Sequence, residues 1–272
     1  MKKLMKAMAL AMVLAMVCGM LMACGGGSSS SGSGEADTQA ASEEGGKIVF
    51  GTNAEFPPFE FVTSEGVIGQ FDGIDMAIAK KIAEDNGMTA EINNMEFDSL
   101  LVALENGQND AVIAGMTVTP ERAEAVDFST PYYTATQVMI VPENSDIKSA
   151  ADMKGKEIRV IQGYTGEVAV KELGDEYKYQ SFKKGSEAIL ELVNGKCDVV
   201  VIDSATAQKY IADNEGLKIV EDNATFGEEQ YAIAVKKGNT ELLDKVNASI
   251  EKMLEDGTIS DLSAQYAEAE AE

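Results

Sequence analysis

From residue 47 onward, short apolar runs alternate with segments whose apolar side chains recur every three or four positions. Runs such as 47–51 and 111–114 are typical of strands buried in a sheet. The segment 73–86 carries its apolar residues on one helical face and is followed by Gly87, a frequent helix terminator. Strands that alternate with helices usually pair in parallel through helical crossovers. The pattern therefore predicts an α/β fold of mostly parallel sheets flanked by helices.

Two segments repeat one pattern with residue numbers 88 apart. Residues 104–115 and 192–203 each contain a helix end, an Asn-Gly pair, two linking residues, an aspartate and an apolar run. An Asn-Gly pair alone is common at helix ends. Because the two segments match at every one of these features in the same order and spacing, they favour two similar α/β lobes. The repeat places Gly115 and Asp203 at equivalent strand ends, where open α/β sheets bind ligands. We expect both strand ends to face one cleft.

Two further β-rich runs, 136–141 and 231–235, resemble each other and are expected to cross between the lobes. We therefore predict that lobe 1 comprises residues 47–138 and 231–272, and that lobe 2 comprises residues 139–230. The second lobe would be an insertion in the first, to which the C-terminal helices return.

The N-terminus is predicted to be an export signal, because three lysines precede an apolar run that is short for a membrane span. The run ends in Leu21-Met22-Ala23-Cys24, which resembles the lipobox of bacterial lipoproteins, where the signal is cut before a cysteine that becomes acylated. Met22 departs from the usual small residue, so an ordinary signal that leaves Cys24 as a free thiol is the alternative. We predict a signal peptide over 1–23, followed over 24–46 by lipidated Cys24 and a flexible Gly/Ser-rich tether.

Charge and composition exclude several functions. The formal net charge of −24 argues against nucleic acid as a partner. The chain has no histidine, which removes Ser-His-Asp catalysis, Cys-His catalysis and histidine metal sites. The three cysteines show no metal-binding spacing, so we expect no metal and no cofactor.

Residues 110–122 combine a buried strand with a helix start that carries an arginine. Thr119 is a suitable N-cap and Pro120 suits the first helical position. Gly115, Thr117 and Arg122 should therefore lie together near a helix N-terminus, where a guanidinium beside free backbone N–H groups can bind a carboxylate. The alternative is an ordinary strand and turn with a surface arginine.

Several motifs are similar to those of one protein family. In chain order they are Gly-Thr-Asn-Ala-Glu-Phe-Pro-Pro-Phe-Glu (51–60), Phe-Asp-Gly-Ile-Asp (71–75), residues 114–122, Asp-Phe-Ser (127–129) with Tyr132-Tyr133, Gln-Gly-Tyr-Thr-Gly (162–166) and Asp203. Together, at these spacings, they resemble the polar amino-acid branch of the solute-binding proteins of bacterial ABC importers, over nearly all of 47–266. The resemblance implies a two-lobed, periplasmic-binding-protein-like fold of type II, in which two crossing strands act as the hinge and the lobes close on one solute.

The resemblance also implies which residues bind the solute. They are Asn53, Phe56, Phe97, Ala114, Gly115, Thr117, Arg122, Gln162, Thr165, Gly166 and Asp203. Arg122 would bind the α-carboxylate with help from backbone groups and from Thr165, Asp203 would bind the α-ammonium, and the two phenylalanines would hold the side chain. Alternatives stay open: Asp203 as a helix cap or surface acid, the phenylalanines as core residues, and Thr165 as a turn residue.

The uncharged side chains of Asn53 and Gln162 favour a neutral polar L-amino acid such as glutamine, with a cationic ligand second because Glu55 is near. The family resemblance thus implies an extracytoplasmic binding protein, a monomer and not an enzyme, whose partners are an L-amino acid and the transmembrane subunits of an ABC permease. The lipobox independently predicts a lipoprotein held to the membrane through Cys24. The alternatives are a ligand-sensing lipoprotein and a dehydratase-type enzyme that uses Glu55 or Glu167 as a general acid.

Overall fold

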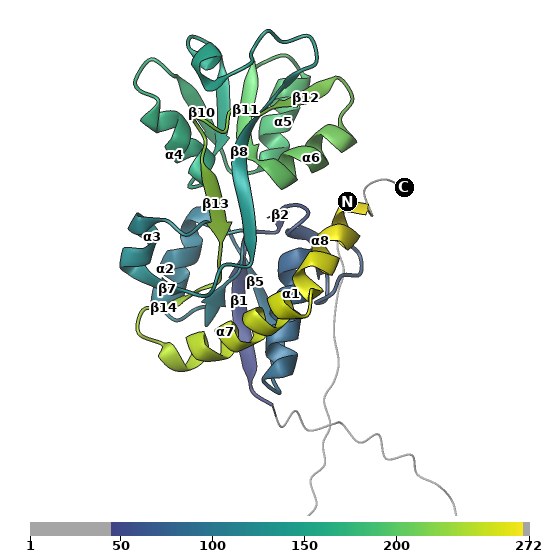
Figure 1. Cartoon of the computed structure of the whole chain (residues 1–272), viewed down its shortest axis with the longest axis vertical. Coiled ribbons are helices and arrows are strands. Elements are labelled where there is room, and N and C mark those ends of the chain that lie inside the picture. The colour runs from purple at the N-terminus through teal and green to yellow at the C-terminus, as the bar shows by residue number, and fades with distance from the viewer. Residues whose placement is uncertain (1–44, 269–272) are drawn as a thin grey trace, which may run out of the picture. The chain divides into compact units, whose positions relative to one another are not determined.

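The computed structural model describes residues 45–268. The predicted signal peptide, Cys24 and nearly all of the predicted tether lie outside the described residues. The described part folds as two lobes, each built on its own sheet, as Figure 1 shows.

Lobe 1 contains a five-stranded sheet with the order β5-β1-β6-β14-β7. Its strands are β1 (Lys47–Thr52), β5 (Thr89–Asn94), β6 (Ala111–Val112), β7 (Val126–Phe128) and β14 (Ala234–Lys236). β1 is parallel to β5 and β6, whereas β14 is antiparallel to β6 and β7. The helices of this lobe are α1 (Ile74–Asp85), the short 3₁₀ turn η1 (Phe97–Ser99), α2 (Leu100–Glu105), α3 (Pro120–Ala125), α7 (Thr240–Glu255) and α8 (Thr258–Glu268). A small sheet joins β2 (Glu55–Phe56), β3 (Glu60–Val62) and β4 (Phe71–Asp72).

Lobe 2 contains a sheet with the order β10-β9-β11-β8-β12, and β13 pairs with a further part of β8. Its strands are β8 (Tyr133–Pro142), β9 (Ile158–Ile161), β10 (Tyr179–Phe182), β11 (Val199–Asp203), β12 (Leu217–Val220) and β13 (Glu228–Tyr231). β9 is parallel to β10 and β11, and β8 is antiparallel to each of its partners. The helices are η2 (Ala150–Met153), α4 (Thr165–Glu172), α5 (Gly185–Val193) and α6 (Ser204–Asp213).

The crossing strands are β8 and β13, which run between the lobes in Figure 1. They pair antiparallel from Thr136 opposite Glu228 to Tyr133 opposite Tyr231. The predicted second crossing, 231–235, begins where β13 ends and overlaps the first two residues of the separate strand β14. The sequence pattern missed β13 because residues 228–230 are polar, and pairing with β8 makes them a strand. The predicted lobe boundaries, 138/139 and 230/231, stay predictions; both fall within these crossing strands.

The sequence repeat corresponds to a repeated structural arrangement. Asp110 accepts a hydrogen bond from the Val49 N–H at 2.8 Å, and its own N–H donates to the Val49 carbonyl at 2.8 Å. Asp198 makes the same two bonds with Glu157, at 2.8 and 2.9 Å. Each aspartate therefore holds the strand that follows it beside a neighbouring parallel strand, β1 in lobe 1 and β9 in lobe 2. As a result Gly115 and Asp203 stand at matching edges of the two sheets.

Buried aromatic rings pack where the crossing strands meet lobe 1. Tyr231 is fully buried, stacks on Tyr133 with ring centres 5.6 Å apart, and makes an edge contact with Phe59 at 5.2 Å. Among the described residues, no helix is both long enough and apolar enough to span a membrane.

Candidate functional site

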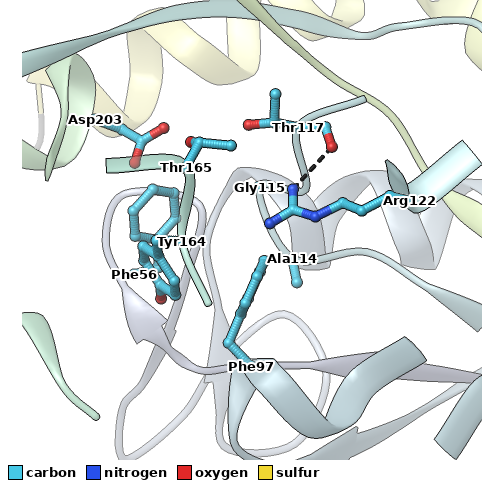
Figure 2. A pocket seen from close by; sticks show the side chains of 9 residues that line it. All are labelled: Phe56, Phe97, Ala114, Gly115, Thr117, Arg122, Tyr164, Thr165 and Asp203. Carbon is cyan, nitrogen blue, oxygen red and sulfur yellow. Dashed lines mark hydrogen bonds between the residues drawn. The ribbon is translucent and has the colours of Figure 1, made fainter. Parts of the chain in front are cut away.

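A pocket lies between the two lobes, and residues from both of them line it (Figure 2). About 200 Å³ of space there is not filled by protein atoms, including adjoining open space. Lobe 1 contributes Phe56, Phe97, Ala114, Gly115, Thr117 and Arg122, and lobe 2 contributes Tyr164, Thr165 and Asp203. The structure thus brings together eight of the eleven predicted site residues and adds Tyr164.

The helix start before Arg122 sets the position of its guanidinium. Thr119 caps α3 by accepting a hydrogen bond from the Arg122 N–H at 3.2 Å, and Pro120 occupies the first turn. The guanidinium donates to the carbonyl of Thr117 at 2.8 Å and, across the cleft, to the carbonyl of Gly163 at 2.9 Å. Arginine has five N–H donors, so others remain for a ligand. Arg122 is therefore not a simple surface arginine.

The guanidinium of Arg122 is also held from the side. It lies over the ring of Phe97, 5.2 Å from the ring centre. Burial lowers its pKa, while the negative charges of Glu229 and Asp203 act in the opposite direction. The result is a fixed cation at one end of the pocket.

Asp203 is an almost fully buried acid at the end of β11, with 3% of its surface exposed. It occupies the N-cap position of α6, yet its side chain makes no capping hydrogen bond. Its carboxylate instead accepts a hydrogen bond from the Tyr231 hydroxyl at 2.5 Å. Burial, and next the charge of Glu229, raise its pKa to about 7. The helix-cap and surface-acid alternatives are thus wrong for Asp203.

Gly115 has a backbone conformation that favours glycine, with φ of 51°. A side chain here would also collide with Phe56, because an added Cβ would lie 2.6 Å from a ring carbon. The Gly115 N–H donates to the carboxylate of Asp75 at 2.8 Å. This N–H is therefore not free for a ligand, contrary to our expectation of free N–H groups after the strand.

Two buried residues near the pocket were not predicted from the sequence. Tyr164 contacts both predicted phenylalanines, with ring centres 4.6 Å from Phe97 and 5.3 Å from Phe56. An aromatic residue inside the Gly-rich loop 162–166 was the available signal. Asp75 is completely buried beneath Gly115 and also accepts a hydrogen bond from the Tyr132 hydroxyl. The sequence feature that could have indicated a special role for Asp75 is its position as an acid on the apolar face of the predicted helix 73–86.

Asn53, Gln162 and Gly166 are the three predicted residues that do not line the pocket. Asn53 is buried with both ends of its amide bonded, to the Met95 carbonyl at 2.9 Å and the Tyr164 hydroxyl at 3.1 Å. Gln162 is exposed and donates across the cleft to Asp98 at 2.8 Å. Gly166 is buried in the first turn of α4. Ligand contacts by these three residues stay predictions.

The two glutamates considered as general acids both have structural partners. Glu55 pairs with Lys184 across the cleft at 2.6 Å. Glu167 accepts hydrogen bonds from the Gly163 N–H at 2.7 Å and from the Ser181 hydroxyl. Neither residue lines the pocket between the lobes. Within residues 45–268, no group of three His, Cys, Asp or Glu side chains is arranged to hold a metal ion.

Comparison with known proteins identifies the family. A family model described as bacterial extracellular solute-binding proteins, family 3, matches residues 48–269. The chain belongs to this family. Among similar proteins is the arginine-binding extracellular protein ArtP of Bacillus subtilis, 34% identical over 90% of this chain and 92% of that protein. The ABC transporter glutamine-binding protein GlnH of the same organism is 33% identical over 91% of this chain and 92% of its own length.

Solved structures agree with this assignment. An ancestral arginine-binding protein bound to glutamine is 43% identical, with a TM-score of 0.75, covering 81% of this chain and 97% of that one. ArtJ from Geobacillus stearothermophilus, an arginine-, lysine-, histidine-binding protein, is 34% identical, also with a TM-score of 0.75, covering 81% of this chain and 94% of its own. The predicted family and the predicted two-lobed type II fold are confirmed.

Proposed function

We propose that this family 3 protein captures a polar L-amino acid between its lobes and delivers it to the permease of an ABC importer. The observation that carries the proposal is the pocket lining, in which the cation Arg122 comes from lobe 1 and the acid Asp203 from lobe 2. The names of its relatives, which include arginine-, histidine- and glutamine-binding proteins, support the same substrate class.

The charges of a free amino acid explain why both residues are needed. Its α-carboxylate and α-ammonium are about two bonds apart, and burying either charge without a partner costs several kcal/mol. Arg122 suits the carboxylate, because a guanidinium can bind both carboxylate oxygens at once. Asp203, when ionised, suits the ammonium group. Because the two partners belong to different lobes, the ligand gains both contacts only when the lobes are close, and binding therefore favours closure.

We propose glutamine, or a similar neutral polar amino acid, as the ligand. The charged residues in the pocket lining are Arg122 and Asp203, and the zwitterion engages both. Glu55, the acid that would favour a cationic side chain, is paired with Lys184. Arginine is the second candidate, because several relatives are named for binding it.

We further propose that the protein acts outside the cytoplasm as a monomeric lipoprotein anchored through Cys24. The sequence Leu21-Met22-Ala23-Cys24 after a basic and apolar segment supports this part of the proposal. Two or three acyl chains would hold the protein firmly at the membrane, whereas one chain binds only marginally. Cys24→Ser should release the protein from the membrane fraction. If mass spectrometry of the wild type finds no acyl group on Cys24, the proposed anchor is wrong.

Calorimetry with glutamine and arginine tests the binding function. Arg122→Ala and Asp203→Asn should each weaken binding by roughly a hundredfold or more, because each leaves one buried ligand charge unpaired. Glu121→Gln is the matched control, since Glu121 is exposed and adjoins Arg122 outside the pocket lining. Melting curves should show that the variants remain folded.

Two outcomes would contradict separate parts of this proposal. Unchanged affinity in both Arg122→Ala and Asp203→Asn would refute the assigned site. Tight binding of arginine with no binding of glutamine would refute only the preference for a neutral side chain.

A further inference from the structure

Glu229 lies beside the pocket on the crossing strand β13, and it is not among the site residues predicted from the sequence. Its backbone pairs with Ala135 on β8, the other crossing strand. One oxygen of its carboxylate accepts hydrogen bonds from the hydroxyl of Thr117 at 2.8 Å and the hydroxyl of Thr165 at 2.7 Å. The same oxygen lies 3.4 Å from the side-chain nitrogen of Gln137.

The two threonines come from different lobes. Thr117 follows β6 in lobe 1, and Thr165 is the first residue of α4 in lobe 2. One oxygen atom can lie within hydrogen-bond distance of both hydroxyls only while the lobes are close together. When the lobes separate, at least one of these bonds must break.

The negative charge of Glu229 makes these bonds stronger than ordinary contacts. Hydrogen bonds to an ionised carboxylate are about twice as strong as bonds between neutral groups. Glu229 is half-buried, so water screens its interactions only in part. Its charge also acts on Arg122 and Asp203, the two charged residues of the pocket lining.

Glu229 does not line the pocket itself, although both threonines do. Gln137 reinforces the arrangement by donating to the hydroxyl of Thr165 at 3.1 Å. The carboxylate therefore holds two pocket hydroxyls in place from behind. This geometry differs from that of a residue that touches the ligand.

We propose that Glu229 is a positioning residue that latches the two lobes in the closed arrangement by binding Thr117 and Thr165 together. The latch slows release of the amino acid, and in this respect it rests on the function proposed above. Its effect on lobe closure does not depend on that function.

The test compares Glu229→Ala and Glu229→Gln with the control Glu228→Gln, which removes a charge from the adjacent exposed residue of the same strand. Stopped-flow measurements with glutamine and arginine give association and release rates. Glu229→Ala should speed release by roughly tenfold to a hundredfold, as expected for losing hydrogen bonds to a charged group, with little change in association. Glu229→Gln keeps an acceptor oxygen and should lie between Glu229→Ala and the wild type.

A double-mutant cycle separates a latch from a general structural role. In a Thr165→Val background, Glu229→Ala should speed release by clearly less than it does in the wild type, because one latch bond is already absent. Additive effects of the two changes would contradict the latch.

Two further results would overturn the proposal. One is a release rate in Glu229→Ala equal to that of the wild type. The other is tighter amino-acid binding by Glu229→Ala, which would mean that the carboxylate competes with the ligand for the two hydroxyls. If the wild type binds no amino acid, the proposed function fails, and small-angle scattering still decides the latch. Glu229→Ala should then have a larger radius of gyration than Glu228→Gln, and equal radii would refute the latch.

Discussion

At the scale of single residues, the main chemical feature is the group of buried acids around the pocket. Asp203, Asp75 and Glu60 each have at most 3% of their surface exposed. Burial raises the pKa of Asp203 to about 7 and that of Asp75 to about 7, and it raises the pKa of Glu60 well above its usual value. The chain has no histidine, so no imidazole titrates in the same range.

The affinity for the amino acid should therefore depend on pH through Asp203. The α-ammonium pairs with the ionised carboxylate, so the dissociation constant should be lowest above pH 7. It should rise as pH falls, approaching about tenfold per unit well below pH 7. Calorimetry between pH 5 and 8 measures this dependence, and Asp203→Asn should remove it. A dissociation constant that stays flat over this range, or falls as pH falls, would contradict the assignment.

At the scale of elements, α1 and the turn after β6 are joined through buried polar groups. α1 starts directly after Gly73 and places Asp75 in its first turn, where the side chain is completely buried. The carboxylate of Asp75 accepts from the Gly115 N–H at 2.8 Å and from the Tyr132 hydroxyl. Glu60 lies beside it, and the pKa of Glu60 is raised by burial first and then by Asp75. The first turn of α1 thus supports the backbone that lines the pocket.

These buried acids predict a stability that falls as pH rises. The pKa of Asp75 in the folded state is about 7, above its ordinary value of 3.8, so the folded protein binds more protons than the unfolded chain between these values. The free energy of unfolding should therefore be highest near pH 4 and fall toward pH 7, by several kcal/mol for a shift of about three units. Urea unfolding at several pH values measures the slope.

Asp75→Asn should flatten that slope, because the amide cannot ionise. Glu84→Gln is the control, since Glu84 lies exposed on the same helix. This variant measures the general effect of removing one negative charge. An equal slope in Asp75→Asn and Glu84→Gln would show that Asp75 ionises normally in the folded protein.

At the scale of the whole described unit, polar contacts join the lobes around the pocket. Glu55 pairs with Lys184 at 2.6 Å, Glu96 lies 4.0 Å from Lys183, and Asp98 accepts a hydrogen bond from Gln162. These side chains are partly exposed, so each ion pair contributes at most about 1 kcal/mol. Together they bias the relative position of the lobes, and none of these residues lines the pocket.

Reversing one charge should therefore favour separation of the lobes. Lys184→Glu replaces attraction to Glu55 with repulsion, and it should raise the radius of gyration and weaken binding by about threefold to tenfold. The exchange Glu55→Lys with Lys184→Glu should restore both values. High salt should reduce the effect, because it screens exposed charges. Wild-type radius and affinity in Lys184→Glu at low salt would contradict a role for this pair in closure.

Much of the fold follows from patterns that are local in the sequence. The apolar runs, the stripe on 73–86 and the repeat with Asp110 and Asp198 predicted two α/β lobes, and the repeat placed Gly115 and Asp203 at matching edges. Thr119 and Pro120 predicted the start of α3, because helix capping depends only on residues that are neighbours in the sequence.

The parts of the site that were not predicted from the sequence depend on contacts between residues far apart in the chain. Tyr164 bonds to Asn53, 111 positions away, and Glu229 bonds to Thr117, 112 positions away. A helical stripe shows which face is buried, but not that Asp75 on that face meets the N–H of Gly115. Such pairings arise only when the lobes and the small sheet come together.

The ring cluster of Phe56, Phe97 and Tyr164 has a practical consequence for spectroscopy. The protein has no tryptophan and eight tyrosines, so ultraviolet excitation at wavelengths longer than those that phenylalanine absorbs reports on phenol rings. Tyr164 belongs to lobe 2, yet it packs against two rings of lobe 1 and donates its hydroxyl proton to Asn53. Any movement of the lobes transfers this chromophore between a dry, hydrogen-bonded setting and water, so the emission intensity of the unlabelled protein can serve as an optical signal of that movement.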